Sequence, residues 1–217
     1  EARAAAEGGV CLQVLLPVGG FATRDVALVA ASPAERVTPG LASDVLSAFR
    51  LGAVRTIHQD PDFGIRLLVD VALRAISPAV NDPSTAYTCV QQLGRLLVRA
   101  IGRHDPAAAR TEAGRPGCVR LPSPSFLRML DHAVTQIRQY SRADFAVTLA
   151  LLDVLRDLAL ETRHRPYLDA IGAQAELIGE TRDPAVFAEP DLARIRAACR
   201  AVQRAIGQEP AATAPSD

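Results

Sequence analysis

Four charged residues follow one another at intervals of four in a segment that is otherwise apolar. Asp62, Arg66, Asp70 and Arg74 are the charged residues between Asp62 and Ile76, and every other residue there is apolar or glycine. On a helix this spacing places them in one gently spiralling stripe of alternating sign. Arginine binds carboxylates and phosphates with two parallel hydrogen bonds, so the stripe has the chemistry of an anion site or of an interface.

The stripe also has a purely structural interpretation. A ladder of ion pairs between residues four apart stabilises an exposed helix by about 0.2–0.5 kcal/mol per pair and binds nothing. Because the rest of the segment is so apolar, we expect this helix to be packed on most sides at the centre of a bundle. The stripe would then face a crevice, another helix or a partner. The internal ladder and the ligand or partner site are both open at this point.

A second group of polar residues stands on the loops before two predicted helices. These loop candidates are Arg55, His58, Asp60, Asn81 and Asp82. Histidine and carboxylates can ligate a divalent metal or transfer protons, so His58, Asp60 and Asp82, with Asp62, would suit a metal-assisted hydrolase. However, Asp60 and Asp82 each precede a proline, and capping of a helix N-terminus accounts for both. We expect no metal site, and since no known catalytic motif occurs, the sequence favours a protein that is not an enzyme.

Composition and charge exclude several classes of protein. All 24 basic residues are arginine, and they balance 24 acidic residues to give a net charge of +0. Without lysine the chain cannot form a Schiff base, supply a Walker-type lysine or carry a lysine-linked prosthetic group. Balanced charge argues against a nucleic-acid partner, which requires a positive field. We therefore expect neither a cofactor nor a nucleic-acid partner.

The cysteines and the apolar runs give an expectation about location. Cys11, Cys89, Cys118 and Cys199 are far apart and form no C-x-x-C pair. This pattern is typical of isolated buried thiols in a reducing compartment, and it resembles neither a disulfide framework nor a zinc site. The sequence shows no secretory signal and no run long enough to span a bilayer, so we expect a soluble chain.

The pattern of turns and apolar residues predicts a mainly α fold, a helical bundle of about seven helices with a small N-terminal β-hairpin module. The hairpin comprises residues 10–16 and 21–30 around the Pro17–Gly20 turn. The predicted helices are 39–51, 60–76, 82–101, 123–140 or 125–140, 144–164, 165–182 and 190–206. The helix at 144–164 is strongly apolar and is expected to be a core helix, and Asp153, Arg156 and Asp157 within it exclude a membrane span.

The predicted domain organisation is a β-containing module at residues 1–36, a helical bundle at 37–207 and a disordered tail at 208–217. Residues 1–7 resemble the end of a helix, which suggests that the sequence begins inside an element. Residues 102–124 are rich in Gly, Pro and Arg and predict a long surface connection, with one short extended piece at 118–121.

The residues around the stripe resemble a known family. The matching residues are Arg55-Thr56, Gln59-Asp60-Pro61, Phe63-Gly64, Asp70, Ala72, Arg74-Ala75, Ser77-Pro78, Asn81-Asp82-Pro83 and Thr85-Ala86. Together they are similar to the signature of a bacterial family of predicted membrane proteins called domain of unknown function 2254. The likeness is dense over residues 49–94 and looser over 117–160, and residues 17–28 are similar to the family's small β module. Val18 is an insertion in that module, and Arg24-Asp25 replaces an expected Pro-Gly pair.

The resemblance implies a membrane-anchored parent protein, with this domain on one side of the bilayer, and the cysteine pattern favours the cytoplasmic side. We therefore expect a soluble regulatory or interaction domain whose partners are the membrane-embedded segment of its own parent and further copies of itself. The alternatives are a metal-assisted hydrolase and a structural cytoplasmic domain of a channel or transporter. The resemblance implies no catalytic mechanism.

Overall fold

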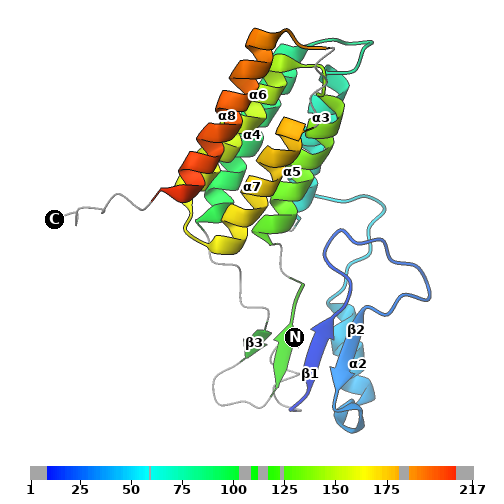
Figure 1. The fold of residues 1–217 in the computed structure, drawn as a ribbon. Coiled ribbons are helices and arrows are strands. Elements are labelled where there is room, and N and C mark those ends of the chain that lie inside the picture. The colour runs from blue at the N-terminus through cyan, green and yellow to red at the C-terminus, as the bar shows by residue number, and fades with distance from the viewer. Residues whose placement is uncertain are drawn as a thin grey trace, which may run out of the picture. The chain divides into compact units, whose positions relative to one another are not determined.

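The structure, a computed structural model, describes residues 9–58, 60–102, 109–111, 117–122, 125–180 and 186–208. The chain divides into two compact units (Figure 1), residues 1–63 with 105–124, here unit 1, and residues 64–104 with 125–217, here unit 2. The sequence alone placed a boundary after residue 36, whereas unit 1 also includes the segments at 37–63 and 105–124. The expected helix end at residues 1–7 and the expected disordered tail, apart from Gln208, lie outside the described residues.

Unit 1 contains a four-stranded sheet with the strand order β2-β1-β4-β3. Its strands are β1 (Cys11–Val14), β2 (Val29–Ser32), β3 (Ala109–Thr111) and β4 (Cys118–Arg120). The predicted hairpin is present, since β1 and β2 pair antiparallel with Leu12 opposite Ala31. The expected extended piece at 118–121 is strand β4, which pairs parallel with β1 and antiparallel with β3. The hairpin is therefore half of a sheet that a distant segment completes.

A short helical segment follows the hairpin within unit 1. It consists of a 3-10 turn, η1 (Ala34–Arg36), and helix α2 (Pro39–Ser47). Thr38 begins α2 by accepting a hydrogen bond from the Leu41 amide on its side-chain oxygen, and Pro39 follows at the first helical position. Leu41 joins Val10 and Leu12 in a small buried cluster between α2 and the sheet. The core of unit 1 is thus built from few side chains.

Two cysteines pair within the sheet, so the expectation of four isolated thiols is wrong for this pair. Cys11 on β1 and Cys118 on β4 are opposite each other in the parallel register, with their Cα atoms 4.4 Å apart, and they form a disulfide. The sequence could not reveal the pair because 107 positions separate the two residues. Cys89 and Cys199 are free thiols, and only Cys89 is fully buried. The disulfide removes the reason that the cysteine pattern gave for a reducing location.

The helices confirm the predicted mainly α fold. Including α2, the described residues form seven α-helices, of which α4 to α8 lie in unit 2 and α3 extends into it from residue 61. The bounds of these helices are α3 (Pro61–Ala75), α4 (Pro83–Ile101), α5 (Phe126–Tyr140), α6 (Phe145–Glu161), α7 (Arg165–Glu180) and α8 (Glu189–Gly207). No helix in the described ranges is both long and apolar enough to cross a membrane.

Helix α6 is a core helix, as its apolar sequence predicted, and it rather than α3 is the centre of unit 2. It packs against α4, α5, α7 and α8, and Leu151, Leu155 and Leu158 are completely enclosed. At the contact with α4, Gly94 leaves room for Val154: a Cβ at Gly94 would lie 2.7 Å from a methyl group of Val154. This helix pair therefore depends on a missing side chain.

The expectation that α3 is packed on most sides is wrong. Ile65, Val69 and Ala72 face the core, but Leu67 and Val71 on the opposite side remain 45% and 43% exposed. The segment is apolar almost all round, and a sequence of that kind does not show how many neighbours surround it. Helix α3 therefore lies at the edge of the bundle with a free apolar face.

Candidate functional site

Asp60 caps the N-terminus of α3 and also forms an ion pair. Asp60 is only 5% exposed, and its Oδ1 accepts a hydrogen bond of 3.1 Å from the Phe63 amide, which caps the helix. Its Oδ2 accepts hydrogen bonds from Nε and Nη2 of Arg55 at 2.9 and 2.6 Å. The Arg55 guanidinium also lies over the ring of Phe63, 5.1 Å from its centroid. The capping interpretation of Asp60 is confirmed, and its carboxylate is fully engaged.

The turn of the hairpin lies against this ion pair. Gly19 has a φ of +76°, and a Cβ at that position would overlap Oδ2 of Asp60 and lie 2.7 Å from Nε of Arg55. Glycine is needed here both for its backbone conformation and for the space. Arg55 and Asp60 therefore hold the turn of the hairpin in place within unit 1, which is a structural role for two of the loop candidates.

Asp82 also acts as a cap. Its Oδ1 accepts a hydrogen bond of 3.1 Å from the Thr85 amide, and its Oδ2 accepts one of 2.5 Å from the Thr85 hydroxyl. The hydrogen bond from the Thr85 hydroxyl is the main cause that lowers the pKa of Asp82 below its ordinary value. Asn81 precedes it with a φ of +50°, a left-handed conformation that asparagine tolerates in a tight turn. Both residues serve to end one helix and to begin the next.

The structure does not gather the loop candidates that it describes around one point. His58 is exposed, while Asp60 is committed to Arg55 and to the end of α3. Among the described residues there is no group of three or more His, Cys, Asp and Glu side chains that could hold a metal ion. The geometry thus gives no support to the metal-assisted hydrolase.

The charged stripe forms only part of the expected ladder. Arg66 donates a hydrogen bond from Nε to Oδ1 of Asp70 at 3.0 Å, and both side chains are about half exposed, at 51% and 46%. Arg74 is exposed, and its guanidinium makes no ion pair with any residue that the structure describes. Asp62 is buried at the start of the helix. The accessible part of the stripe is therefore Arg66, Asp70 and Arg74, next to the exposed Leu67 and Val71.

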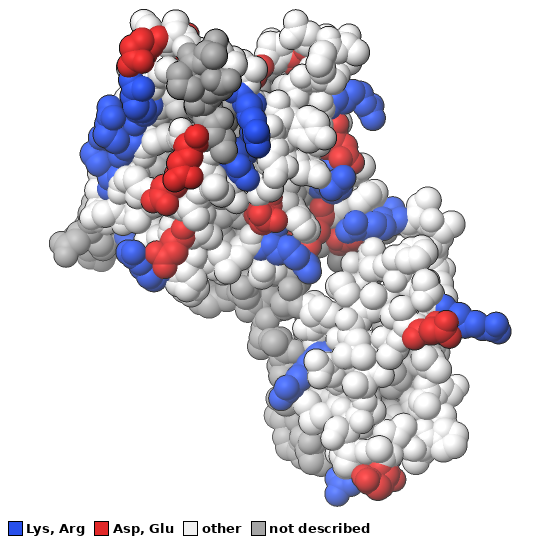
Figure 2. All heavy atoms as spheres, turned by 45° about the vertical axis from the view of Figure 1, so that its right-hand side comes forward, with Lys and Arg blue, Asp and Glu red and all other residues white. Residues whose placement is uncertain are grey.

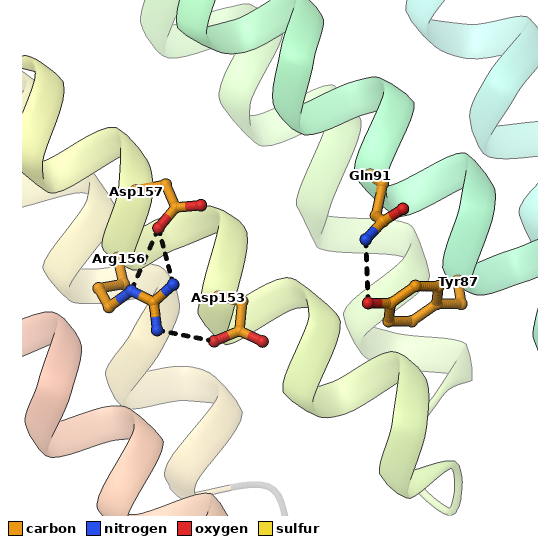
Figure 3. A network of polar contacts seen from close by, with 5 residues as sticks. All are labelled: Tyr87, Gln91, Asp153, Arg156 and Asp157. Atoms are coloured by element: carbon orange, nitrogen blue, oxygen red, sulfur yellow. Dashed lines mark hydrogen bonds and ion pairs between the residues drawn. The ribbon is translucent and has the colours of Figure 1, made fainter.

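A groove that the sequence did not predict lies between α4 and α6. Figure 3 shows its polar contacts, in which Arg156 lies between two carboxylates of its own helix. Arg156 donates to Asp157 at 2.8 and 3.1 Å and to Asp153 at 3.1 Å, while Gln91 donates to the hydroxyl of Tyr87 at 2.9 Å. The hydrogen bond to Asp157 raises the pKa of Arg156, which keeps its charge fixed. The volume of the groove is about 560 Å³.

The groove carries two arginines that are available for an anionic group. Arg95 and Arg99 lie along it, and neither forms an ion pair with a described residue. Its acids, Asp153 and Asp157, are engaged by Arg156, and its described lining includes no histidine, cysteine or serine that could act as a base or nucleophile. The signal in the sequence was Arg95 and Arg99, four residues apart on a helix, which is common on solvated faces.

The chain is similar to a known family of proteins. The family described as predicted membrane protein (DUF2254) matches residues 2–157. An uncharacterized protein of Mycobacterium tuberculosis and one of Mycobacterium bovis are each 34% identical to the chain over 166 residues, which is 76% of this chain and 32% of theirs. The chain thus spans about a third of the length of these relatives. No solved structure matches it.

Proposed function

Since this chain belongs to the DUF2254 family of predicted membrane proteins, we propose that it is a non-catalytic interaction domain of its membrane-anchored parent. We propose further that it associates with a second copy of itself through the outer face of α3, defined by Arg66, Leu67, Asp70, Val71 and Arg74. In the parent protein this association would bring together membrane-embedded segments of separate copies, and it would give the domain its regulatory role.

The observation that carries the proposal is the exposed face of α3. Leu67 and Val71 are one helical turn apart, and they remain 45% and 43% exposed although the opposite face of the helix is buried. Arg66 and Asp70 run beside them as an ion pair, and Arg74 carries a charge that no described residue neutralises. An apolar seam flanked by charged residues is the usual composition of a helix that packs against a partner.

The order of charges along α3 suits a second copy of the same helix. A two-fold axis brings identical surfaces together, so residue i of one copy meets residue j of the other and the reverse. If two α3 helices cross antiparallel near Leu68, Arg66 of each copy approaches Asp70 of the other, and the seams of Leu67 and Val71 meet between them. Opposite charges then face each other twice, which makes the face self-complementary.

The decisive experiment is a charge exchange measured by native mass spectrometry and by light scattering on a sizing column. The wild-type chain is expected to be dimeric at micromolar concentration. Arg66→Asp makes an aspartate of each copy face Asp70 of the other, so the repulsion should dissociate the dimer. Asp70→Arg makes an arginine of each copy face Arg66 of the other and should have the same effect. The double variant R66D/D70R restores alternating sign and should recover the dimer. Arg74→Ala is expected to weaken it less, since no acidic partner is assigned to Arg74.

The apolar seam has a matched control in unit 2. Leu67→Glu should abolish association, whereas Leu160→Glu, at the end of α6 with the same 45% exposure, should leave it unchanged. A chain that remains monomeric at all concentrations contradicts the dimer. Dissociation by Leu160→Glu as much as by Leu67→Glu would show that α3 is not the interface.

A further inference from the structure

Unit 1 contains a cavity that the sequence did not predict. Its volume is about 660 Å³, and its walls are one face of the sheet, the C-terminal end of α2 with the residues after it, and the turn of the hairpin. Figure 1 shows α2 next to β2, and residues of α2, β1 and β2 contribute to the lining of the cavity. Small-molecule sites have volumes of about 300–1,000 Å³, so the cavity has the size of a ligand site.

The walls are apolar but incompletely packed. Val14 on β1, Val29 on β2 and Val45 on α2 all line the cavity, and each is only partly buried. Full burial of such side chains would contribute about 1.5–3 kcal/mol each, and the small core of unit 1 leaves much of that unrealised. Phe49 and Leu16 add further apolar surface to the lining. An apolar occupant would therefore gain the burial that the protein itself does not complete.

One lining side chain is charged. Arg50 lies three residues after the end of α2. It is exposed, and its guanidinium forms no hydrogen bond or ion pair with any residue that the structure describes. Acidic side chains are absent from the described lining. Figure 2 shows that the visible face of unit 1 carries few charged side chains of either sign. The cavity thus combines an apolar interior with a single unneutralised positive charge.

We propose that this cavity binds an anionic amphiphile, with its alkyl chain against Val14, Val29, Val45 and Phe49 and its carboxylate or phosphate against Arg50. The head group of the ligand should be anionic, because one guanidinium without an ion-pair partner in an apolar wall favours one carboxylate or phosphate. The apolar lining decides the tail. A peptide in the same place would bury amide groups without hydrogen-bond partners, at a cost that an alkyl chain does not incur.

The turn of the hairpin gives the site its shape. Pro17, Gly19 and Gly20 contribute to the wall, and Gly19 rests on the Arg55–Asp60 ion pair. The amide of Gly20 donates a hydrogen bond of 2.9 Å to the carbonyl of Pro17, which closes the turn. One side of the cavity is therefore anchored by the part of unit 1 that the buried carboxylate of Asp60 stabilises. The site is largely formed before a ligand enters it.

The test is a calorimetric titration of the full chain with dodecanoate below its micelle concentration, in parallel with dodecanol as the neutral analogue. Wild-type protein should bind one dodecanoate and should bind dodecanol about three- to tenfold more weakly, since the head group loses its charge-assisted hydrogen bonds. Arg50→Gln should bind the two ligands equally, while Arg24→Gln, an exposed arginine of unit 1 outside the cavity, should behave as wild type. Ala48→Phe fills the cavity and should bind neither.

Two outcomes overturn the proposal. The first is the absence of dodecanoate binding, or binding that Arg50→Gln does not alter. The second is attachment to a bilayer surface in place of binding in the cavity, which is tested with vesicles of phosphatidylcholine and phosphatidylglycerol. Attachment to these vesicles that persists in Ala48→Phe would show adsorption to a surface and no ligand in the cavity. Circular dichroism of Ala48→Phe verifies its folding, and Arg50→Gln, a surface change, keeps the test valid if Ala48→Phe unfolds.

Discussion

Gly19 and Asp60 are in contact in unit 1 although they are distant in the sequence, because the turn of the hairpin rests on the carboxylate that caps α3. The contact leaves no room for a side chain. Gly19→Ala must place its Cβ against Asp60 and Arg55 in a backbone conformation with a φ of +76°, so we expect a loss of about 1–3 kcal/mol in the free energy of unfolding. Urea unfolding followed by circular dichroism measures it.

Gly40→Ala is the matched control, because Gly40 lies in α2 of the same unit and the nearest atom to its added Cβ is 3.9 Å away. It should leave stability unchanged or raise it slightly. Equal stability of the Gly19→Ala and Gly40→Ala variants would contradict the close contact between the turn and the ion pair.

Removal of the buried carboxylate should destabilise unit 1. Asp60→Ala deletes the helix cap and leaves the Arg55 guanidinium without its partner, at an expected cost of about 1–3 kcal/mol, since Arg55 is partly exposed to water. Asp60→Asn keeps an oxygen for the Phe63 amide and should lose less. Chemical unfolding of both variants checks the order, and a larger loss in Asp60→Asn than in Asp60→Ala would be inconsistent with the two roles assigned to Asp60.

The packing of α4 on α6 depends on Gly94. Gly94→Ala would force its Cβ against the branched side chain of Val154 at 2.7 Å, and we expect a loss of about 1–3 kcal/mol from overpacking. Val154→Ala removes the obstructing methyl groups, so the double variant should be more stable than the sum of the two single changes predicts. Melting temperatures of the four proteins form the cycle. Additive effects would mean that the two residues do not meet.

Asp82 should make stability depend on pH. Its pKa is lower in the folded than in the unfolded chain, because the Thr85 hydroxyl and amide donate to its carboxylate. The stability that this cap contributes is therefore present above the unfolded pKa and is lost as the pH falls through the folded pKa. Asp82→Asn caps without titrating, so the wild type should melt higher near pH 7, and the difference should shrink as the pH falls through the folded pKa of Asp82. A difference that does not change with pH would rule out this titration.

The Cys11–Cys118 disulfide can be measured directly. Alkylation of the denatured chain without a reductant should label two of the four thiols, Cys89 and Cys199, and prior reduction should expose all four. Reduction should also lower the free energy of unfolding, by up to about 4–5 kcal/mol for a loop of this length in the chain-entropy account. Cys89→Ser with Cys199→Ser serves as the control that retains the bridge. Labelling of all four cysteines without reduction would contradict the disulfide and support the four free thiols that the sequence predicted.

Local patterns predicted much of the fold. Asp60 and Asp82 were expected to be helix caps because each precedes a proline, and both accept the expected hydrogen bonds. The apolar run around Leu155 was expected to form the core helix and does so as α6. Caps, proline positions and periodic apolar residues act within a few residues of one another, so a sequence contains them directly.

Features that depend on distant residues could not be predicted in this way. The disulfide partner of Cys11 could not be predicted, because Cys118 is brought opposite it only by the pairing of β1 with β4. Nothing in the local sequence of either strand indicates that pairing. The same pairing and the position of α2 create the cavity beside Arg50, and the approach of Gly94 to Val154 creates the groove.

The charged stripe on α3 shows most clearly what the local sequence determines and what the tertiary structure determines. The sequence by itself determined that Arg66, Asp70 and Arg74 share one face of a helix, because the period of the helix is a local property of the backbone. Only the tertiary structure decided that this face is exposed together with Leu67 and Val71, since burial depends on which helices surround α3. The order of charges along a helix is therefore encoded locally, whereas what those charges meet is set by packing, which sums contacts over the whole chain.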